Sequence, residues 1–390
     1  MITASDIERF LPQDFADATL VGRIADSTQD GDPCVVMLRE GRVLDITHVA
    51  PTVSDLLEQD EPVRFLRQQS GRREWPLEEV IENTLAQRKS APRFIAPCDL
   101  QVIKACGVTF VGSMLERVIE EKASGDPLKA DQIRSSISEI VGSAIQKVTP
   151  GSPQAAKVKA FLQSNDLWSQ YLEVGIGPDA EVFTKAPVLS SVGSGEDIGI
   201  LRKSEWNNPE PELVLAVDSR GYVKGVTLGN DVNLRDIEGR SALLLGKAKD
   251  NNGSCAIGPL IRVFDENFTI DDARTLQISL SIQGEDGYVL EGHSSLSEIS
   301  RDLLDLVNQT IGTHHQYPDG VMLFTGTLFA PTDDRGEKGQ GFTHKVGDRV
   351  TISAAALGAL VNTVRHSEDL PPWTFGVRQL MRSLQRRGFL

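Results

Sequence analysis

Residues 208–217 read NPEPELVLAV and decide how the core of this chain is built. Proline cannot donate to a β-ladder, so the two prolines place Glu210 and Glu212 at the start of a strand. Residues two apart on a strand project from the same face, about 7 Å apart along the backbone. The turn sequence DSRG (218–221) and an apolar return strand over 222–228 follow, which together predict a β-hairpin.

The register of this hairpin brings a third acid to the two glutamates. With the turn centred near residues 219 and 220, Asp231 lies opposite position 208, one step from Glu210. Three neighbouring carboxylates repel one another unless protonation at a raised pKa or a hard divalent cation neutralises them. Oxygen ligands without a nearby His or Cys favour Mg²⁺, Mn²⁺ or Ca²⁺ over zinc. Glu210, Glu212 and Asp231 are therefore candidate metal ligands, and the alternative from the pattern alone is that these acids at a strand entry are simply solvated.

Composition and charge restrict the partners of the chain. Its 390 residues contain 40 Lys and Arg against 55 Asp and Glu, a net charge of −15, which argues against nucleic acid or an anionic membrane as the main partner. No uncharged apolar run reaches the roughly 18 residues of a membrane span, and residues 1–23 lack the pattern of a signal peptide. Four cysteines without a CxxC pair favour reduced thiols, so we expect a cytoplasmic protein with a small-molecule partner.

The hydrophobic patterns predict an α+β chain with two domains. Residues 1–95 form a small N-terminal α/β domain with a hairpin over 34–49 and helices near 53–59 and 77–87. Residues 96–390 form the main domain, with strands over 320–328 and 349–354 and helices over 114–147, 155–172 and 295–312. Phosphate-binding loops, dinucleotide-binding glycine motifs, HExxH and GxSxG are absent, which disfavours the enzyme classes that use them.

Five ordered motifs resemble those of the fumarylacetoacetate hydrolase family. ExEL at 210–213 and NDVNLRD at 230–236 resemble its core motif. GK at 246–247 with GP at 258–259, TGT at 325–327, GD at 347–348 and TKAP at 184–187 match further family segments. The resemblance covers roughly residues 100–365. The chain length and GVTFVGSMLE at 107–116 resemble most the branch of 2-keto-3-deoxyxylonate dehydratases.

This resemblance implies a catalytic domain of mixed β-sandwich or β-roll form, assembled as a homodimer or homotetramer. It also implies that Glu210, Glu212 and Asp231 bind Mg²⁺ (or Mn²⁺ or Ca²⁺). Lys247 corresponds to the site lysine of the family. Arg235, Thr327 and Gly326 correspond to residues on the substrate side.

The chain departs from the family in two places. Many family hydrolases carry GxNYxxHxxE, whose His and Glu activate water; here Ser113 stands at the histidine position and Glu116 is retained. A hydroxyl cannot replace imidazole as a base near neutral pH, which puts C–C bond hydrolysis in doubt. The second departure is a helical insertion over 116–171, interpreted as a lid or as an interface element.

The resulting expectation is a Mg²⁺-dependent dehydratase that converts 2-keto-3-deoxy-D-xylonate to 2,5-dioxopentanoate. In this interpretation Lys247 removes the C3 proton and Glu116 protonates the leaving C4 hydroxyl. Two alternatives stay open: a C–C hydrolase or decarboxylase of a 2,4-dioxo acid, and a catalytically silent family member. The configuration at C4 of the substrate is not determined by the sequence.

Overall fold

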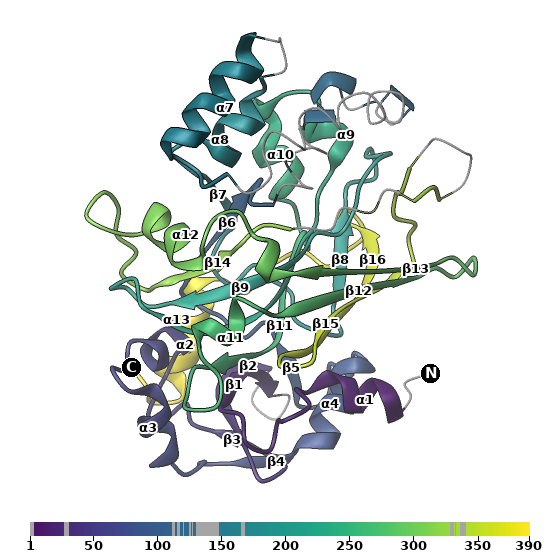
Figure 1. Cartoon of the computed structure of the whole chain (residues 1–390). Coiled ribbons are helices and arrows are strands. Elements are labelled where there is room, and N and C mark those ends of the chain that lie inside the picture. Colours follow the sequence, from purple (N-terminus) through teal and green to yellow (C-terminus); the bar gives the residue numbers. More distant parts are fainter. Residues whose placement is uncertain are drawn as a thin grey trace.

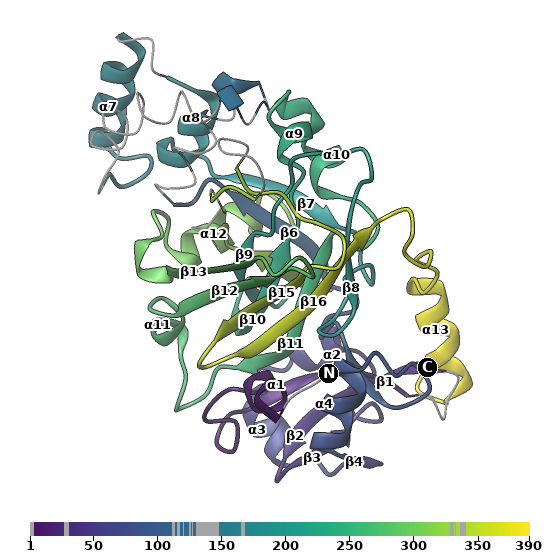
Figure 2. The same ribbon diagram turned by 90° about the vertical axis from the view of Figure 1, so that its right-hand side faces the viewer.

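The computed structural model describes residues 4–26, 31–110, 148–164, 168–327 and 341–390, with isolated positions between 114 and 129 and between 331 and 335. Two β-sheets form its centre, and helices gather at both ends (Figures 1 and 2). The prediction of an α+β chain built on mixed β-sheets is confirmed.

The larger sheet contains the predicted hairpin at its centre. Its strands run in the order β4 (Glu74–Pro76), β3 (Arg42–Asp45), β2 (Asp32–Arg39), β1 (Leu20–Asp26), β11 (Cys255–Val263), β10 (Val223–Asp231), β9 (Pro211–Val217), β14 (Val321–Phe324), β6 (Val102–Gly107) and β7 (Glu181–Ala186), with β5 (Arg93–Ile95) paired to β1. Apart from the parallel pair β14–β6, the neighbouring strands are antiparallel.

The smaller sheet packs against this centre and completes the core. Its order is β13 (Val289–Ser295), β12 (Gln277–Gln283), β15 (Arg349–Ala354), β16 (Gly358–His366) and β8 (Asp197–Ile200). Leu213 and Leu215 of β9 belong to the same apolar cluster as Leu280 and Ile352 of this sheet, whereas Val214 and neighbouring even positions belong to a second cluster on the opposite face. Strand β9 is therefore buried on both faces, which explains its continuous apolar sequence.

The N-terminal segment extends the larger sheet. Strand β1 pairs antiparallel with β11, so Val21 lies opposite Ile261, and one apolar cluster joins both segments. The hairpin predicted over 34–49 is confirmed as β2–β3, and the predicted helices are α2 (Val53–Leu57) and α4 (Leu77–Leu85); α1 (Ala4–Phe10) and α3 (Pro62–Arg67) accompany them. The boundary predicted near residue 95 falls between two strands of the same sheet.

Four helices lie at the end of the sheets away from the N-terminal helices (Figures 1 and 2). They are α7 (Pro153–Ser164), α8 (Gln170–Ile176), α9 (Arg235–Glu238) and α10 (Leu245–Lys249), with a 3₁₀ turn (Ala242–Leu244) before α10. Residues 130–147 and several shorter stretches of the predicted insertion over 116–171 lie outside the described residues. Its described part packs through Leu162 and Tyr171 in one apolar cluster with Val108, just beyond β6.

The helix predicted over 295–312 is shorter in the structure. Strand β13 ends at Ser295, a 3₁₀ turn spans Leu296–Glu298, and α12 covers Leu303–Thr310 with Asp302 as its N-cap. Two further helices, α11 (Ile270–Ala273) and α13 (Val377–Arg386), lie outside the sheets.

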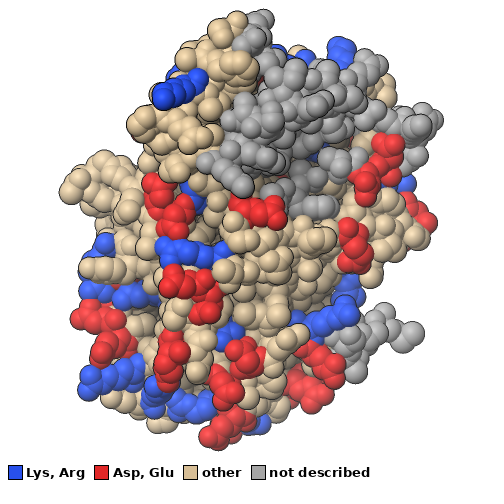
Figure 3. All heavy atoms as spheres, viewed as in Figure 1, with Lys and Arg blue, Asp and Glu red and all other residues tan. Residues whose placement is uncertain are grey.

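The surface charges are mixed in sign, and the cysteines are buried. Acidic and basic side chains are interspersed on the face shown in Figure 3. All four cysteines are buried free thiols, and burial raises the pKa of Cys98 and of Cys255 to about 12. In the described part of the chain, no helix has the length and apolar character needed to cross a bilayer.

Candidate active site

The β9–β10 hairpin sets the position of the three predicted acids. The predicted hairpin is confirmed, but its register is two positions further along, since Gly229 pairs with Glu212 and Asn230 with Pro211. The turn holds one more residue than expected, and a bulge between Val223 and Gly225 adds another. Consequently Asp231 lies opposite Glu210, and its amide donates a 3.0 Å hydrogen bond to the Glu210 carbonyl.

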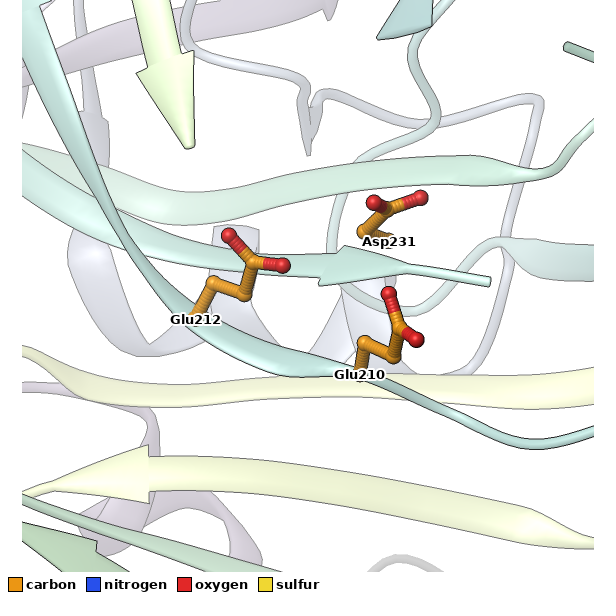
Figure 4. A group of neighbouring side chains, drawn as sticks. All are labelled: Glu210, Glu212 and Asp231. Atoms are coloured by element: carbon orange, nitrogen blue, oxygen red, sulfur yellow. The ribbon is translucent and has the colours of Figure 1, made fainter. Parts of the chain in front are cut away.

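The carboxylates of Glu210, Glu212 and Asp231 converge at this end of the hairpin. One oxygen from each lies within 4.8 Å of the others, and all three side chains are buried. Figure 4 shows the three side chains projecting into the same space; Glu212 lies on β9, Glu210 directly precedes that strand, and Asp231 ends β10. Local β-geometry has therefore brought together the acids that the sequence predicted.

Backbone groups hold the two glutamates in place. The Gly326 amide donates a 2.6 Å hydrogen bond to the Glu212 carboxylate, and the Glu210 amide donates to the Asn230 side chain at 3.1 Å. Gly326 has a φ of +92°, and a Cβ there would collide with the Thr109 hydroxyl. Gly326, predicted to contact substrate, thus orients a carboxylate in this structure.

Two buried lysines neutralise part of the acidic charge. The ammonium group of Lys249 contacts Glu210 and lies 3.0 Å from Oδ2 of Asp231. The ammonium group of Lys185 lies 2.8 Å from Oδ1 of Asp231. Sequence reasoning passed over both residues, although Lys185 lies in the TKAP segment and Lys249 in the same GKAK turn as the lysine it chose.

The prediction that Lys247 is the site lysine needs correction. Residues two apart on a helix point in nearly opposite directions, so only one of Lys247 and Lys249 can face the acids. Ala248 and Lys249 are buried, whereas Lys247 is exposed on α10. The lysine beside the carboxylates is therefore Lys249.

Charge and burial shift the pKa values of the acids in opposite directions. Burial, followed by repulsion from Asp231 and Glu210, raises the pKa of Glu212 well above its ordinary value. Burial opposes ionisation of Asp231 too, but the ammonium groups of Lys185 and Lys249 outweigh it and lower the pKa of Asp231. The site thus combines an ionised aspartate with a glutamate that holds a proton more readily.

This donor set fits a hard divalent cation. Ligands on opposite sides of such an ion are about 4.2 Å apart for Mg²⁺ and about 4.8 Å for Ca²⁺, taking twice the usual metal–oxygen distance. The three carboxylate oxygens span a comparable distance, and no nitrogen or sulfur ligand accompanies them among the described residues. Glu210, Glu212 and Asp231 would hold the cation.

The remaining predicted residues have different surroundings. Thr327 lines the cavity beside the acids and donates a 3.0 Å hydrogen bond to the Pro211 carbonyl. Arg235 is buried on α9, with its guanidinium 4.4 Å from the centre of the Trp206 ring and within hydrogen-bonding distance, 3.2 Å, of the Pro331 carbonyl. It is absent from the described lining of the cavity, so substrate contact by Arg235 stays a prediction. Ser113 and Glu116 lie outside the described residues.

The cavity beside the triad has further acidic and apolar walls that sequence reasoning missed. Its solvent-accessible volume of about 20 Å³ is close to the size of one water molecule. Besides the acids, Lys249 and Thr327, its lining consists of Cys106, Gly107, Val108, Glu181, Phe183 and Glu238. These residues come from β6, β7 and α9, and no spacing in the sequence links them.

A comparison with protein families matches the segment of the chain that carries most residues of this site. The model of the fumarylacetoacetate hydrolase C-terminal family matches residues 177–365. Residues 177–365 belong to the fumarylacetoacetate hydrolase family. This segment contains all three acids and both buried lysines, and it confirms the resemblance seen in the motifs.

Curated relatives of this chain include sugar-acid dehydratases. The chain is 35% identical over 185 residues to 2-dehydro-3-deoxy-D-arabinonate dehydratase of Saccharolobus solfataricus, and 32% identical over 202 residues to a probable 2-keto-3-deoxyxylonate dehydratase of Haloferax volcanii. The aligned regions cover 47% and 52% of this chain but only 58% and 66% of the relatives. A mitochondrial oxaloacetate tautomerase of Rattus norvegicus is 32% identical over 155 residues, 39% of this chain and 45% of the relative.

Solved structures share the fold over most of the chain. The apo form of 2-keto-3-deoxy-D-arabinonate dehydratase superimposes with a TM-score of 0.62 at 23% identity, covering 89% of this chain and 99% of that one. The same enzyme complexed with magnesium and 2,5-dioxopentanoate gives a TM-score of 0.61 at the same identity and coverage. At this identity the likeness establishes the fold alone.

Proposed function

We propose that this family member is a divalent-metal-dependent dehydratase of 2-keto-3-deoxy pentonates, with 2-keto-3-deoxy-D-xylonate as the expected substrate and 2,5-dioxopentanoate as the product. The observation that carries the proposal is the contact of Lys249 with two of three converging carboxylates. Cation ligands and a proton carrier thereby share one buried site. The two curated relatives named as pentonate dehydratases support the substrate class.

The chemistry requires removal of a C3 proton and loss of the C4 hydroxyl as water. A divalent cation held by Glu210, Glu212 and Asp231 would supply Lewis acidity at the 2-oxo acid group, which acidifies C3–H. Lys249 is the described lysine that contacts two of these ligands, and we assign the removal of that proton to its neutral amine form. This assignment replaces the one made for Lys247 from the sequence.

The leaving hydroxyl needs its own proton donor. Glu116 is the candidate taken from the family resemblance. Among the described residues, Glu181 and Glu238 are further carboxyl groups that line the cavity. Once water has left, tautomerisation toward C5 gives 2,5-dioxopentanoate.

Burial of this acid set argues against a silent scaffold. Three carboxylates and two lysines are removed from solvent here. Buried charges of like sign lower the stability of a fold, so a cluster of this kind is expected only where it serves a function. Ser113 in place of the family histidine disfavours hydrolysis of a C–C bond, because that reaction needs a base for water.

Product analysis tests the proposal directly. The protein is incubated with each C4 epimer of 2-keto-3-deoxypentonate and Mg²⁺, and products are identified by mass spectrometry and proton NMR. We expect 2,5-dioxopentanoate from at least one epimer and none after treatment with EDTA. Pyruvate would show C–C cleavage, keto–enol exchange of oxaloacetate without loss of water would show a tautomerase, and no turnover of any substrate would show a silent protein. Each of these three results rejects the dehydratase proposal.

A further inference from the structure

Lys185 is a fully buried lysine on β7 that the proposed reaction does not use. Its ammonium group lies 2.8 Å from Oδ1 of Asp231. It also donates hydrogen bonds to the Val232 carbonyl, at 3.2 Å, and to the Lys249 carbonyl. One side chain therefore contacts both the segment that carries a cation ligand and the segment that carries the site amine.

The contact with Asp231 divides that carboxylate between two cations. Oδ1 faces Lys185, and Oδ2 lies 3.0 Å from Lys249 at the triad. Lys185 has no access to solvent, so its positive charge is screened by the protein alone. A dication bound at the triad would be repelled by this charge and would find Oδ1 of Asp231 already engaged.

The contact with the Lys249 carbonyl fixes the end of α10. The same carbonyl accepts a second hydrogen bond, 2.7 Å long, from the Ser254 hydroxyl. Two donors on one carbonyl restrict the backbone from which the Lys249 side chain extends. The position of the amine relative to the acids therefore depends on Lys185.

We propose that Lys185 is a positioning residue that weakens the hold of the triad on its cation and fixes the turn that presents Lys249, an inference that rests on the metal-dependent function proposed above. The first effect is electrostatic and acts on Asp231. The second is geometric and acts on Lys249. Together they keep the bound ion exchangeable and the amine in one place.

Lys185→Met separates these effects because they change two measurements in opposite directions. Loss of the ammonium removes the repulsion and frees Oδ1 of Asp231, so Mg²⁺ should bind at least about tenfold more tightly in titration calorimetry. The tighter ion should also give a larger rise in melting temperature on Mg²⁺ addition than in the wild type. At saturating Mg²⁺, kcat should fall at least about tenfold, because Lys249 is no longer fixed. General damage to the fold would weaken binding and turnover together.

Lys224→Met is the matched control. Lys224 lies 3.4 Å from the buried Asp218 and donates to the Gln59 carbonyl at 2.9 Å, near the opposite end of β10 from Asp231. This variant loses a similar ion pair and should keep the wild-type Mg²⁺ affinity and kcat.

Ser254→Ala tests the geometric effect without a change of charge. It removes the second donor to the Lys249 carbonyl, so kcat should fall while Mg²⁺ affinity stays within about threefold of the wild type. Lys185→Arg keeps the charge and should likewise leave the affinity near the wild-type value. If Lys185→Met does not fold, Ser254→Ala still tests the geometric half, and a change of Mg²⁺ affinity in Lys185→Arg would contradict an effect that is carried by charge alone.

The outcomes distinguish this inference from the proposed function. Failure of the wild-type protein to bind Mg²⁺ would reject the proposed function. Normal binding and turnover in the wild type, with no gain of Mg²⁺ affinity in Lys185→Met, would overturn the electrostatic role. Unchanged kcat in both Lys185→Met and Ser254→Ala would overturn the geometric role.

Discussion

The ammonium group of Lys249 lies 3.0 Å from the carboxylate of Asp231, although 18 residues separate the two in the sequence. Asp231 ends strand β10, and Lys249 ends the short helix α10 that follows. This contact places an amine at the edge of the acid triad. Activity and metal binding should depend on that arrangement and on the residues that maintain it.

Lys249→Met should lower kcat/KM for the pentonate substrate at least about 100-fold, because it removes the proposed proton carrier. Lys247→Met is the control, since Lys247 is exposed on the same helix, and it should stay within about twofold of the wild type. Steady-state kinetics at saturating Mg²⁺ compares the two. Loss of activity in Lys247→Met with retention in Lys249→Met would restore the assignment made from the sequence.

Removal of divalent ions with EDTA should abolish turnover, and Mg²⁺ or Mn²⁺ should restore it. The same ions should raise the melting temperature, because a ligand bound only by the folded state stabilises that state. Asp231→Asn should lose most of this thermal shift, since it removes a ligand charge from the triad. Full activity in the metal-free protein would contradict the metal-dependent mechanism.

Gly326→Ala should destabilise the protein by more than about 1 kcal/mol and weaken Mg²⁺ binding. Alanine is strained at a positive φ, and its Cβ would displace Thr109 and the amide that holds Glu212. Gly41→Ala provides the control, because Gly41 has a φ of +69° and no atom lies within 4 Å of the place that an alanine methyl group would take. It should show the backbone strain alone in urea unfolding and unchanged Mg²⁺ affinity. Equal Mg²⁺ affinities in the two variants would show that Gly326 does not contribute to the metal site.

Because His344 is buried, we expect the free energy of unfolding to fall in mild acid. Burial is the main cause that lowers the pKa of His344, with the nearby Arg335 adding to it. The unfolded chain therefore binds a proton that the folded chain resists, and stability falls as pH drops below about 6.5, by at most about 1.4 kcal/mol per pH unit. Asp348, 3.2 Å from the ring, has a lowered pKa, so its contribution is lost only in stronger acid.

His344→Gln should reduce this pH dependence between pH 7.5 and 5. Unfolding free energies from urea titration at several pH values give the slope. His48→Gln, at an exposed position, should keep the wild-type slope. An identical slope in His344→Gln and the wild type would show that His344 titrates alike in both states.

The hairpin and its acids could be predicted because their geometry is local. Prolines at 209 and 211 mark the start of β9, and alternation along one strand puts Glu210 and Glu212 on the same face. The register was wrong by two positions because turn width and a bulge are decided by the packing of both strands. Even so, Asp231 remained within reach of the glutamates, since a small slip along a hairpin keeps its end residues close.

Tertiary structure decided the features that depend on contacts between distant segments. The phase of the five-residue helix α10 is set by packing of Ala248 into the core, and it turns Lys249 inward and Lys247 outward. Lys185 lies 2.8 Å from Asp231 although β7 is four strands away from β10 in the sheet order, so the curvature of the sheet brings these two strands together. The N-terminal strands join the same sheet through the pairing of β1 with β11. The sequence by itself determined which acids would meet, because neighbours along a hairpin have few ways to be arranged. It did not determine which cations would meet them, because such long-range contacts follow from burial of the whole core.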